Sequence, residues 1–95
     1  MLFDSHNHLQ NPRFDQLRDD LISEMRRVGI SRCVINGTTE SDWSKVKKLA
    51  QDHPDLVIPS YGLHPWHLEQ RSDHWSDTLA SLLIESPNAA IGECG

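Results

Sequence analysis

The sequence contains few basic residues. Nine lysines and arginines stand against fourteen aspartates and glutamates, which gives a formal net charge of −5 at pH 7. A chain with this balance has no broad basic surface, which argues against non-specific binding to nucleic acid. A phosphate-containing substrate would therefore need a metal ion in its binding site.

Segments that direct a chain to a membrane are also missing. The N-terminal residues MLFDSHNHL have neither the basic start nor the long apolar stretch of a signal peptide, and no later apolar run is long enough to span a bilayer. The two cysteines, Cys33 and Cys94, lie in apolar runs typical of buried strands and have no partner at zinc-finger or redox spacing. We therefore expect a cytoplasmic protein with reduced thiols and no membrane partner.

Several catalytic motifs are absent as well. The sequence has no Gly-rich phosphate loop, no G-x-S-x-G elbow and no cysteine placed to act as a nucleophile with a histidine base. These absences leave water activated by a metal ion as the favoured chemistry.

Apolar runs rich in β-forming residues alternate with helical patterns along the chain. The predicted strands are Leu2 to Ser5, Arg32 to Gly37, Leu56 to Gly62 and Ala89 to Glu93. Each intervening helix returns the chain so that the next strand runs the same way, which predicts a parallel sheet. Four such strands could form an open sheet or half of an eight-stranded barrel.

Three helices are predicted between these strands from apolar residues at helical spacing. The first has Asn11-Pro12 as its cap and first turn and ends at Gly29. The second begins near Ser41 as cap and ends before Pro54. The third carries an apolar stripe that Ser86-Pro87 closes; its members are Trp75, Leu79, Leu82 and Leu83.

Polar side chains gather where the predicted strands end. His6 and His8 follow the first strand, Asn36 and Thr38 the second and His64 the third, while Glu93 ends the fourth. The C-terminal ends of parallel strands share one edge of the sheet, and ligands bind at that edge. The sequence therefore predicts a single site there.

The pair His6 and His8 is the sharpest motif. In an extended segment side chains two residues apart point the same way, so two imidazoles can meet one cation while Asn7 points elsewhere. Asp4 shares their side and could orient one imidazole by a hydrogen bond. The alternative is two surface histidines that lie near a strand end by chance. Their position after a buried apolar strand favours the metal site.

Glu93 is the second candidate ligand. It follows residues 89–92, a run whose composition implies burial. A lone buried carboxylate is costly unless it meets a cation or good hydrogen-bond donors. The pattern therefore favours a ligand role over a strand-end glutamate that faces water.

The segment GLHPWH, residues 62–67, predicts a tight turn at the end of the third strand. It holds His64 at the mouth of the site, where the ring could hydrogen-bond an oxyanion of a substrate. Trp66 could stack on a base or a sugar, but a loop tryptophan more often packs over the rim of its own core, and we interpret it so. The remaining histidines are interpreted as loop or capping residues without function: His53, His67 and His74.

Four ordered motifs resemble the TatD family of metal-dependent hydrolases, within the amidohydrolase-like barrels. The motifs are Phe3-Asp4-Ser5-His6-Asn7-His8-Leu9, Asn36-Gly37-Thr38, Gly62-Leu63-His64-Pro65 and Ile91-Gly92-Glu93-Cys94-Gly95. They occur in the family's order and at about its spacing, and the resemblance covers the whole chain.

The resemblance implies that residues 1–95 are a single partial domain. The implied fold is the first half of a TIM-type (β/α)8 barrel, with about four parallel strands and three intervening helices, truncated after strand four. It also implies two divalent cations, with His6 and His8 on one and a catalytic Glu93 bridging both; zinc, manganese and magnesium are not distinguished. His64 is expected near the substrate phosphate. DNA or another phosphodiester is the expected substrate, and the expected activity is that of a deoxyribonuclease.

The family's remaining ligands, two histidines and an aspartate after later strands, would lie beyond Gly95. We therefore expect this chain alone to be weakly active or inactive and to self-associate through the incomplete barrel. A non-catalytic metal-binding or interaction fragment that pairs with another chain is the alternative. A further alternative, a polymerase-and-histidinol-phosphatase-like barrel, shares the Asp-x-His-x-His opening but matches the third and fourth motifs less well.

Overall fold

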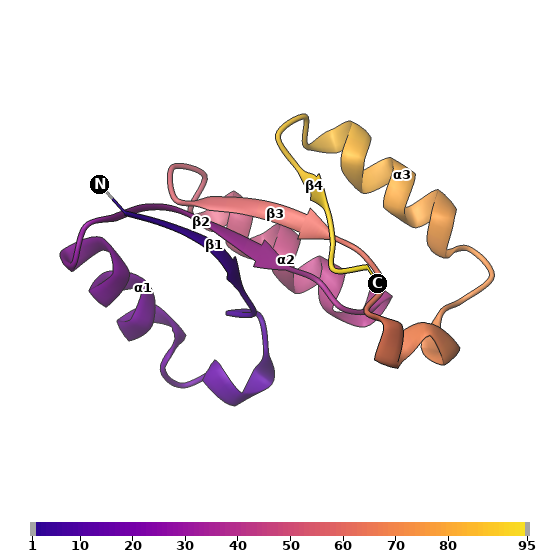
Figure 1. Ribbon diagram of the computed structural model, residues 1–95, viewed down its shortest axis with the longest axis horizontal. Coiled ribbons are helices and arrows are strands. Elements are labelled where there is room, and N and C mark those ends of the chain that lie inside the picture. The colour runs from indigo at the N-terminus through magenta and orange to yellow at the C-terminus, as the bar shows by residue number, and fades with distance from the viewer. Residues whose placement is uncertain (1, 95) are drawn as a thin grey trace.

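The computed structural model describes residues 2–94, and strands and helices alternate along them (Figure 1). The elements are β1 (Leu2–Asn7), η1 (Pro12–Phe14), α1 (Arg18–Arg27), β2 (Ile30–Asn36), α2 (Glu40–Asp52), β3 (Val57–Tyr61), η2 (Pro65–Gln70), α3 (Trp75–Glu85) and β4 (Ala90–Ile91), where η1 and η2 are 3-10 helices. The predicted alternation of four strands and three α-helices is confirmed. None of the helices within these residues is both long enough and apolar enough to cross a membrane.

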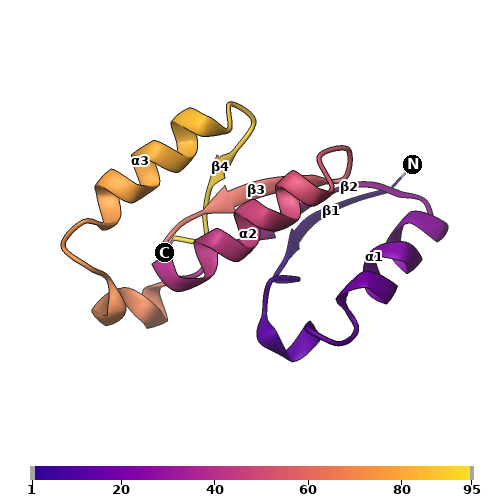
Figure 2. The same ribbon diagram turned by 180° about the vertical axis from the view of Figure 1, so that it is seen from behind.

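The four strands form one parallel sheet whose spatial order is the order of the chain. β1 pairs with β2, β2 with β3 and β3 with β4, every pair parallel. A doubly wound sheet would instead reverse its strand order at a switch point. The sheet curls, and α1, α2 and α3 flank it along its length (Figures 1 and 2). The predicted fold class, the first half of a TIM-type barrel, is therefore confirmed.

The core lies between the middle strands and α2, which crosses in front of them in Figure 2. Ile35 and Tyr61 from the strands and Val46 from the helix are fully buried, and Trp43 is 1% exposed. The indole Nε1 of Trp43 donates a hydrogen bond of 2.8 Å to the carbonyl of Gly62. This bond joins the start of α2 to the loop after β3, which carries His64.

Two helix starts differ from the sequence prediction. Asn11 does cap a helix, since its side chain accepts from the N–H of Arg13, but that helix is the short η1, and α1 begins only at Arg18. The second helix begins two residues earlier than a cap at Ser41 would place it, with Thr39 as its cap. The cause is Asp42, which accepts the backbone N–H of Thr39 at 3.3 Å. The side chain of Thr39 in turn accepts from the backbone of Asp42, and this reciprocal pair of contacts is a stronger cap than a single serine.

The burial expected for the last apolar run of the chain is wrong at Ala90, Ile91 and Cys94, although Gly92 is buried. β4 covers only Ala90–Ile91, Ile91 is 63% exposed and Cys94 is exposed. An apolar run is buried only where another layer covers it, and here Ile91 and Cys94 border an open groove beside α3. Cys33, by contrast, is fully buried in β2 as predicted.

The two thiols should consequently differ in reactivity. Burial raises the pKa of the Cys33 thiol above its usual value, so little thiolate forms there at pH 8, and the side chain is inaccessible as well. We expect a disulfide reagent such as DTNB to label one thiol of the native chain rapidly and the second only after denaturant is added. A Cys94→Ser variant should lose the rapid phase and Cys33→Ser should keep it. Two thiols reacting at one rate in the native chain would contradict this burial.

Candidate metal centre

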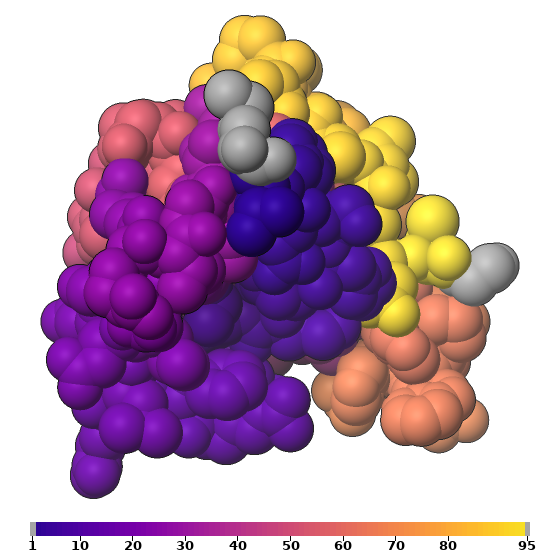
Figure 3. Space-filling view, turned by 60° about the vertical axis from the view of Figure 1, so that its left-hand side comes forward, coloured from indigo at the N-terminus to yellow at the C-terminus, as the bar shows by residue number. Residues whose placement is uncertain are grey.

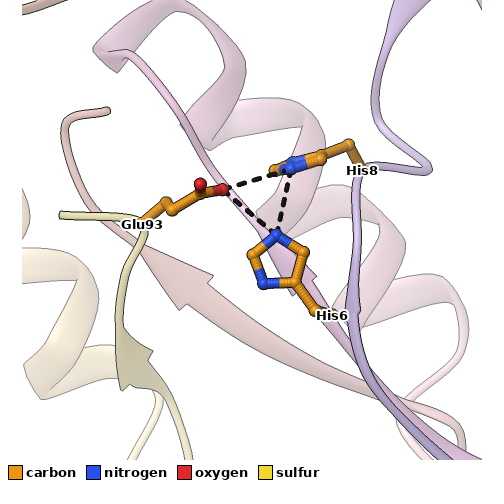
Figure 4. A group of neighbouring side chains, drawn as sticks. All are labelled: His6, His8 and Glu93. Carbon is orange, nitrogen blue, oxygen red and sulfur yellow. Dashed lines mark hydrogen bonds and ion pairs between the residues drawn. The ribbon is translucent and has the colours of Figure 1, made fainter. Parts of the chain in front are cut away.

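Four side chains meet at the C-terminal edge of the sheet, and they come from the ends of three strands (Figure 4 shows three of these side chains). His6 lies in β1 and His8 just after it, His64 follows β3 and Glu93 follows β4. The space-filling view shows the first and last segments of the chain side by side (Figure 3). The structure thus brings together the residues that their strand positions predicted would share one site.

His6, His8 and Glu93 converge on one point. The Nε2 atoms of His6 and His8 are 3.2 Å apart, and each lies 3.2 Å from Oε2 of Glu93. The two rings stand nearly perpendicular, at 86°. One ligand atom from each residue lies within 4.8 Å of the others, a spacing that could hold a metal ion. His6 is the most exposed of the three, so the point opens to solvent.

Backbone contacts decide which nitrogen of His8 carries the proton. Nδ1 of His8 lies 2.8 Å from the carbonyl oxygen of Asn36, which can only accept a hydrogen bond. Nδ1 is therefore the protonated nitrogen of the neutral ring, and Nε2 presents a lone pair to His6 and Glu93. A carbonyl that fixes the far nitrogen of an imidazole is the usual support of a metal-ligating histidine.

His64 adopts the opposite tautomer. Its Nδ1 accepts the backbone N–H of Trp66 at 3.1 Å, so the proton of the neutral ring lies on Nε2. That Nε2 faces Oε1 of Glu93 at 3.4 Å. The ring is thus placed to hold the glutamate, and its expected position near a substrate phosphate stays a prediction. The same Trp66 bond begins η2 and leaves Trp66 88% exposed, so the expectation that Trp66 packs over the core is wrong.

The donor set fits a divalent cation. Oε2 of Glu93 is buried at the atomic level and has no hydrogen-bond partner among residues 2–94, although both imidazoles lie 3.2 Å away. Oε2 of Glu93 and Nε2 of His8 each present a lone pair to this point, and Nε2 of His6 faces both. Such an arrangement is repulsive unless a proton or a cation lies between the atoms. Nitrogen and carboxylate oxygen ligands suit zinc and manganese among other cations.

Asp4 does not orient an imidazole as expected. Its carboxylate accepts the backbone N–H of His6 at 3.1 Å and the side-chain amide of Asn7 at 2.9 Å. Asp4 therefore shapes the irregular end of β1, where the pairing register with β2 shifts. The contact that orients an imidazole comes instead from the Asn36 carbonyl, which also accepts from the buried Gln10 at 2.7 Å. The sequence pointed to Asn36 by position only, and no periodic signal identifies Gln10.

Glu93 is held in place by its backbone. Its N–H donates to the carbonyl of Gly37 at 3.1 Å, and the N–H of Gly92 donates to Tyr61 at 2.9 Å. The hydroxyl of Ser60 donates to the Gly92 carbonyl at 3.1 Å. These bonds join the end of β4 to the ends of β2 and β3, so the carboxylate position follows from the sheet and not from a free loop.

Gly62 makes this approach possible. A Cβ at position 62 would lie 2.6 Å from the carbonyl carbon of Gly92 and 2.9 Å from the nitrogen of Glu93, both backbone atoms. Real Cβ atoms do not approach backbone this closely. The sequence pattern predicted a turn at Gly62 but not its role in the close packing of two strand ends.

The family model described as TatD related DNase matches residues 3–95. This chain belongs to that family. A protein named 3'-5' ssDNA/RNA exonuclease TatD from Erwinia tasmaniensis is 34% identical over 94 residues, a match that covers 99% of this chain and 36% of the relative. Proteins of the same name from Pantoea ananatis and Pectobacterium atrosepticum are 33% and 32% identical, with the same two coverages. The chain thus spans about a third of the length of these TatD relatives.

Substitution of Gly62 tests the close approach at the centre. Gly62→Ala should lower the free energy of unfolding by about 1 to 3 kcal/mol, because the added methyl forces apart the backbones after β3 and β4. Urea denaturation followed by circular dichroism measures the change. Ser44→Ala, at an exposed position in the middle of α2, is the control and should stay within about 0.5 kcal/mol of wild type. A Gly62→Ala chain as stable as wild type would contradict the tight packing.

Proposed function

We propose that this chain carries a metal-binding part of a hydrolase that cleaves phosphodiester bonds of nucleic acid, with His6, His8 and Glu93 as ligands. The observation that carries the proposal is the convergence of these three side chains, from the two ends of the chain, on one point within 4.8 Å. Three matching TatD relatives bear the name 3'-5' ssDNA/RNA exonuclease, which supports the substrate class.

The residues of this chain would hold the cation and set its surroundings. His8 offers Nε2 because Asn36 fixes its proton on Nδ1, and His6 offers the facing Nε2. His64 holds the outer oxygen of Glu93, so the inner oxygen stays directed at the histidines. A divalent cation bound there supplies an acidified water and neutralises charge on a phosphoryl oxygen.

We further propose that the complete centre holds two cations and that Glu93 bridges them. Its two oxygens face different sides, Oε2 toward His6 and His8 and Oε1 toward His64. A carboxylate with two separated oxygens is the ligand type that can contact two cations at once. The ligands of the second cation would come from the part of the relatives that this chain does not match.

Metal titration tests the ligand assignment. We expect the isolated chain to bind Zn²⁺ or Mn²⁺ weakly by calorimetry, because three protein ligands are present. The His6→Ala, His8→Ala double variant should lose at least about 10- to 100-fold in affinity, the cost of disturbing even an outer partner of a ligand. Equal binding by wild type and double variant would remove the assignment.

The matched control removes two histidines elsewhere. His53 and His74 flank helices α2 and α3 away from the centre, so the His53→Ala, His74→Ala variant should bind as wild type does. β1 and β4 form the outer strands of the described sheet, and self-association through them would let a second copy add ligands. Light scattering on the same samples therefore gives the number of chains per bound ion.

Catalysis should require the rest of a barrel. We expect the 95-residue chain to show no metal-dependent cleavage of single-stranded DNA above background. Fusion of the Erwinia tasmaniensis relative's unmatched C-terminal part after this chain should give such cleavage. In the fusion, Glu93→Gln should lower the rate at saturating Mn²⁺ by at least about 10- to 100-fold, because an amide is a far poorer bridge between cations.

Glu69→Gln, at an exposed position in η2, is the matched control and should cleave as the parent fusion does. Equal rates for Glu93→Gln and Glu69→Gln would mean that Glu93 is not a catalytic ligand. A fusion that binds metal through His6 and His8 but never cleaves would favour the alternative function, a metal-binding module without catalysis.

A further inference from the structure

Two basic side chains of this acidic protein stand apart from the rest. Within residues 2–94 every other lysine or arginine side chain donates to a carboxylate or to a backbone carbonyl, whereas those of Arg13 and Lys45 have no such partner. The Arg13 guanidinium lies 4.7 Å above the ring of Phe14, which limits its freedom and leaves its donors unused. Both side chains line the same cleft.

This cleft adjoins the metal centre. Its volume is about 490 Å³, and His8 and His64 form the part of its wall nearest Glu93. In Figure 3 the segment after β1 and the segment of η2 stand on either side of a notch. Small-molecule sites commonly measure about 300 to 1,000 Å³, so the cleft has room for a nucleotide. Arg13 after β1, Lys45 in α2 and Trp66 in η2 all line this cleft.

Trp66 forms an exposed aromatic wall of the cleft. It is the most exposed of the large hydrophobic side chains described, at 88%, against 81% for Ile84, the next most exposed. Its position is nevertheless fixed, because Pro65 precedes it and its N–H donates to His64. Its ring meets that of His64 edge to face, with centroids 5.1 Å apart and 67° between planes, so a ring face is left uncovered.

From these contacts we propose that Trp66, Arg13 and Lys45 form a subsite for a nucleotide of a single-stranded oligonucleotide next to the metal centre. The base stacks on Trp66, and the flanking phosphates lie toward Arg13 and Lys45. Stacking on an aromatic ring beside a basic groove is how proteins hold single strands without reading their sequence. The subsite rests on the function proposed above, and it adds a base-binding contact that the metal ligands do not supply.

The arrangement selects a single strand over a duplex. A base can offer its face to Trp66 only when it is unstacked from its neighbour, and a paired base in a duplex cannot. His64 lies between Trp66 and Glu93, because its ring contacts that of Trp66 and its Nε2 is 3.4 Å from the carboxylate. A base stacked on Trp66 therefore lies beside the position of the phosphate that the centre would attack.

Binding of labelled oligothymidylate to the 95-residue chain tests the subsite without catalysis. The probe is fluorescein-labelled dT8 followed by anisotropy at low salt in EDTA, so that no cation takes part. We expect Trp66→Ala to weaken binding by about 5- to 150-fold, the measured range for loss of one stacked base, and Trp66→Phe to retain part of it. Ile84→Ala, an equally exposed apolar position on α3, is the control and should bind as wild type.

Two further readouts separate stacking from charge. Arg13→Ala and Lys45→Ala should each reduce the dependence of log affinity on log salt by about 0.7, the value for one phosphate contact on a single strand. The ion-paired controls Arg27→Ala and Lys48→Ala should leave that slope unchanged. An abasic version of the probe, which keeps every phosphate, should bind wild type only as well as dT8 binds Trp66→Ala.

Equal affinity of wild type and Trp66→Ala for dT8, or equal affinity of dT8 and the abasic probe for wild type, would overturn the proposal. Because the dT8 assay contains EDTA, its outcome does not depend on bound metal. The outcomes for the two proposals are therefore distinct: loss of metal binding or cleavage leaves the subsite standing, and loss of stacking leaves the metal centre standing.

Discussion

The centre depends on the junction between the ends of β3 and β4. Backbone bonds from Gly92 to Tyr61 and from Glu93 to Gly37 place the glutamate, and only a glycine at position 62 lets the two backbones come so close. The carboxylate then meets His6 and His8, which β1 delivers from the far side of the sheet.

Two backbone hydrogen bonds of opposite direction fix the tautomers of the histidines around Glu93. A carbonyl of β2 accepts from His8, while an N–H of η2 donates to His64. Two rings of the same residue type therefore present different groups to Glu93, a lone pair from one and an N–H from the other. The two carboxylate oxygens are thereby made unequal, since Oε2 faces the lone pair of His8 and Oε1 faces the N–H of His64.

Sequence patterns predicted the sheet and the position of the centre because both follow from periodicity. Parallel strands must end at one edge, so polar residues after each strand, such as His6 and Glu93, had to lie near one another. Hydrogen bonds from side chains to the backbone at the ends of helices and strands do not follow from periodicity and were not predictable in the same way. Three such contacts arise from local competition for backbone N–H donors. Asp42 accepts from Thr39 and moves the start of α2, and Asp4 accepts from His6 and does not contact an imidazole. His64 accepts from Trp66, whose side chain is left exposed. Burial of Ile91 was overestimated because composition does not show which layer covers a strand.

The consecutive order of the strands has a consequence for the entropy of the site. In an unfolded chain, bringing His6 to Glu93 would mean closing a loop almost as long as the chain itself. Loop-closure cost rises with length, by about 0.6 kcal/mol for each doubling, before any ligand contact is made. In this fold that closure is divided into three shorter ones, β1 onto β2, β2 onto β3 and β3 onto β4, each completed by its own ladder of hydrogen bonds. His6 and Glu93 therefore come together at no separate entropic cost, because the pairing of the strands has already closed the loop between them.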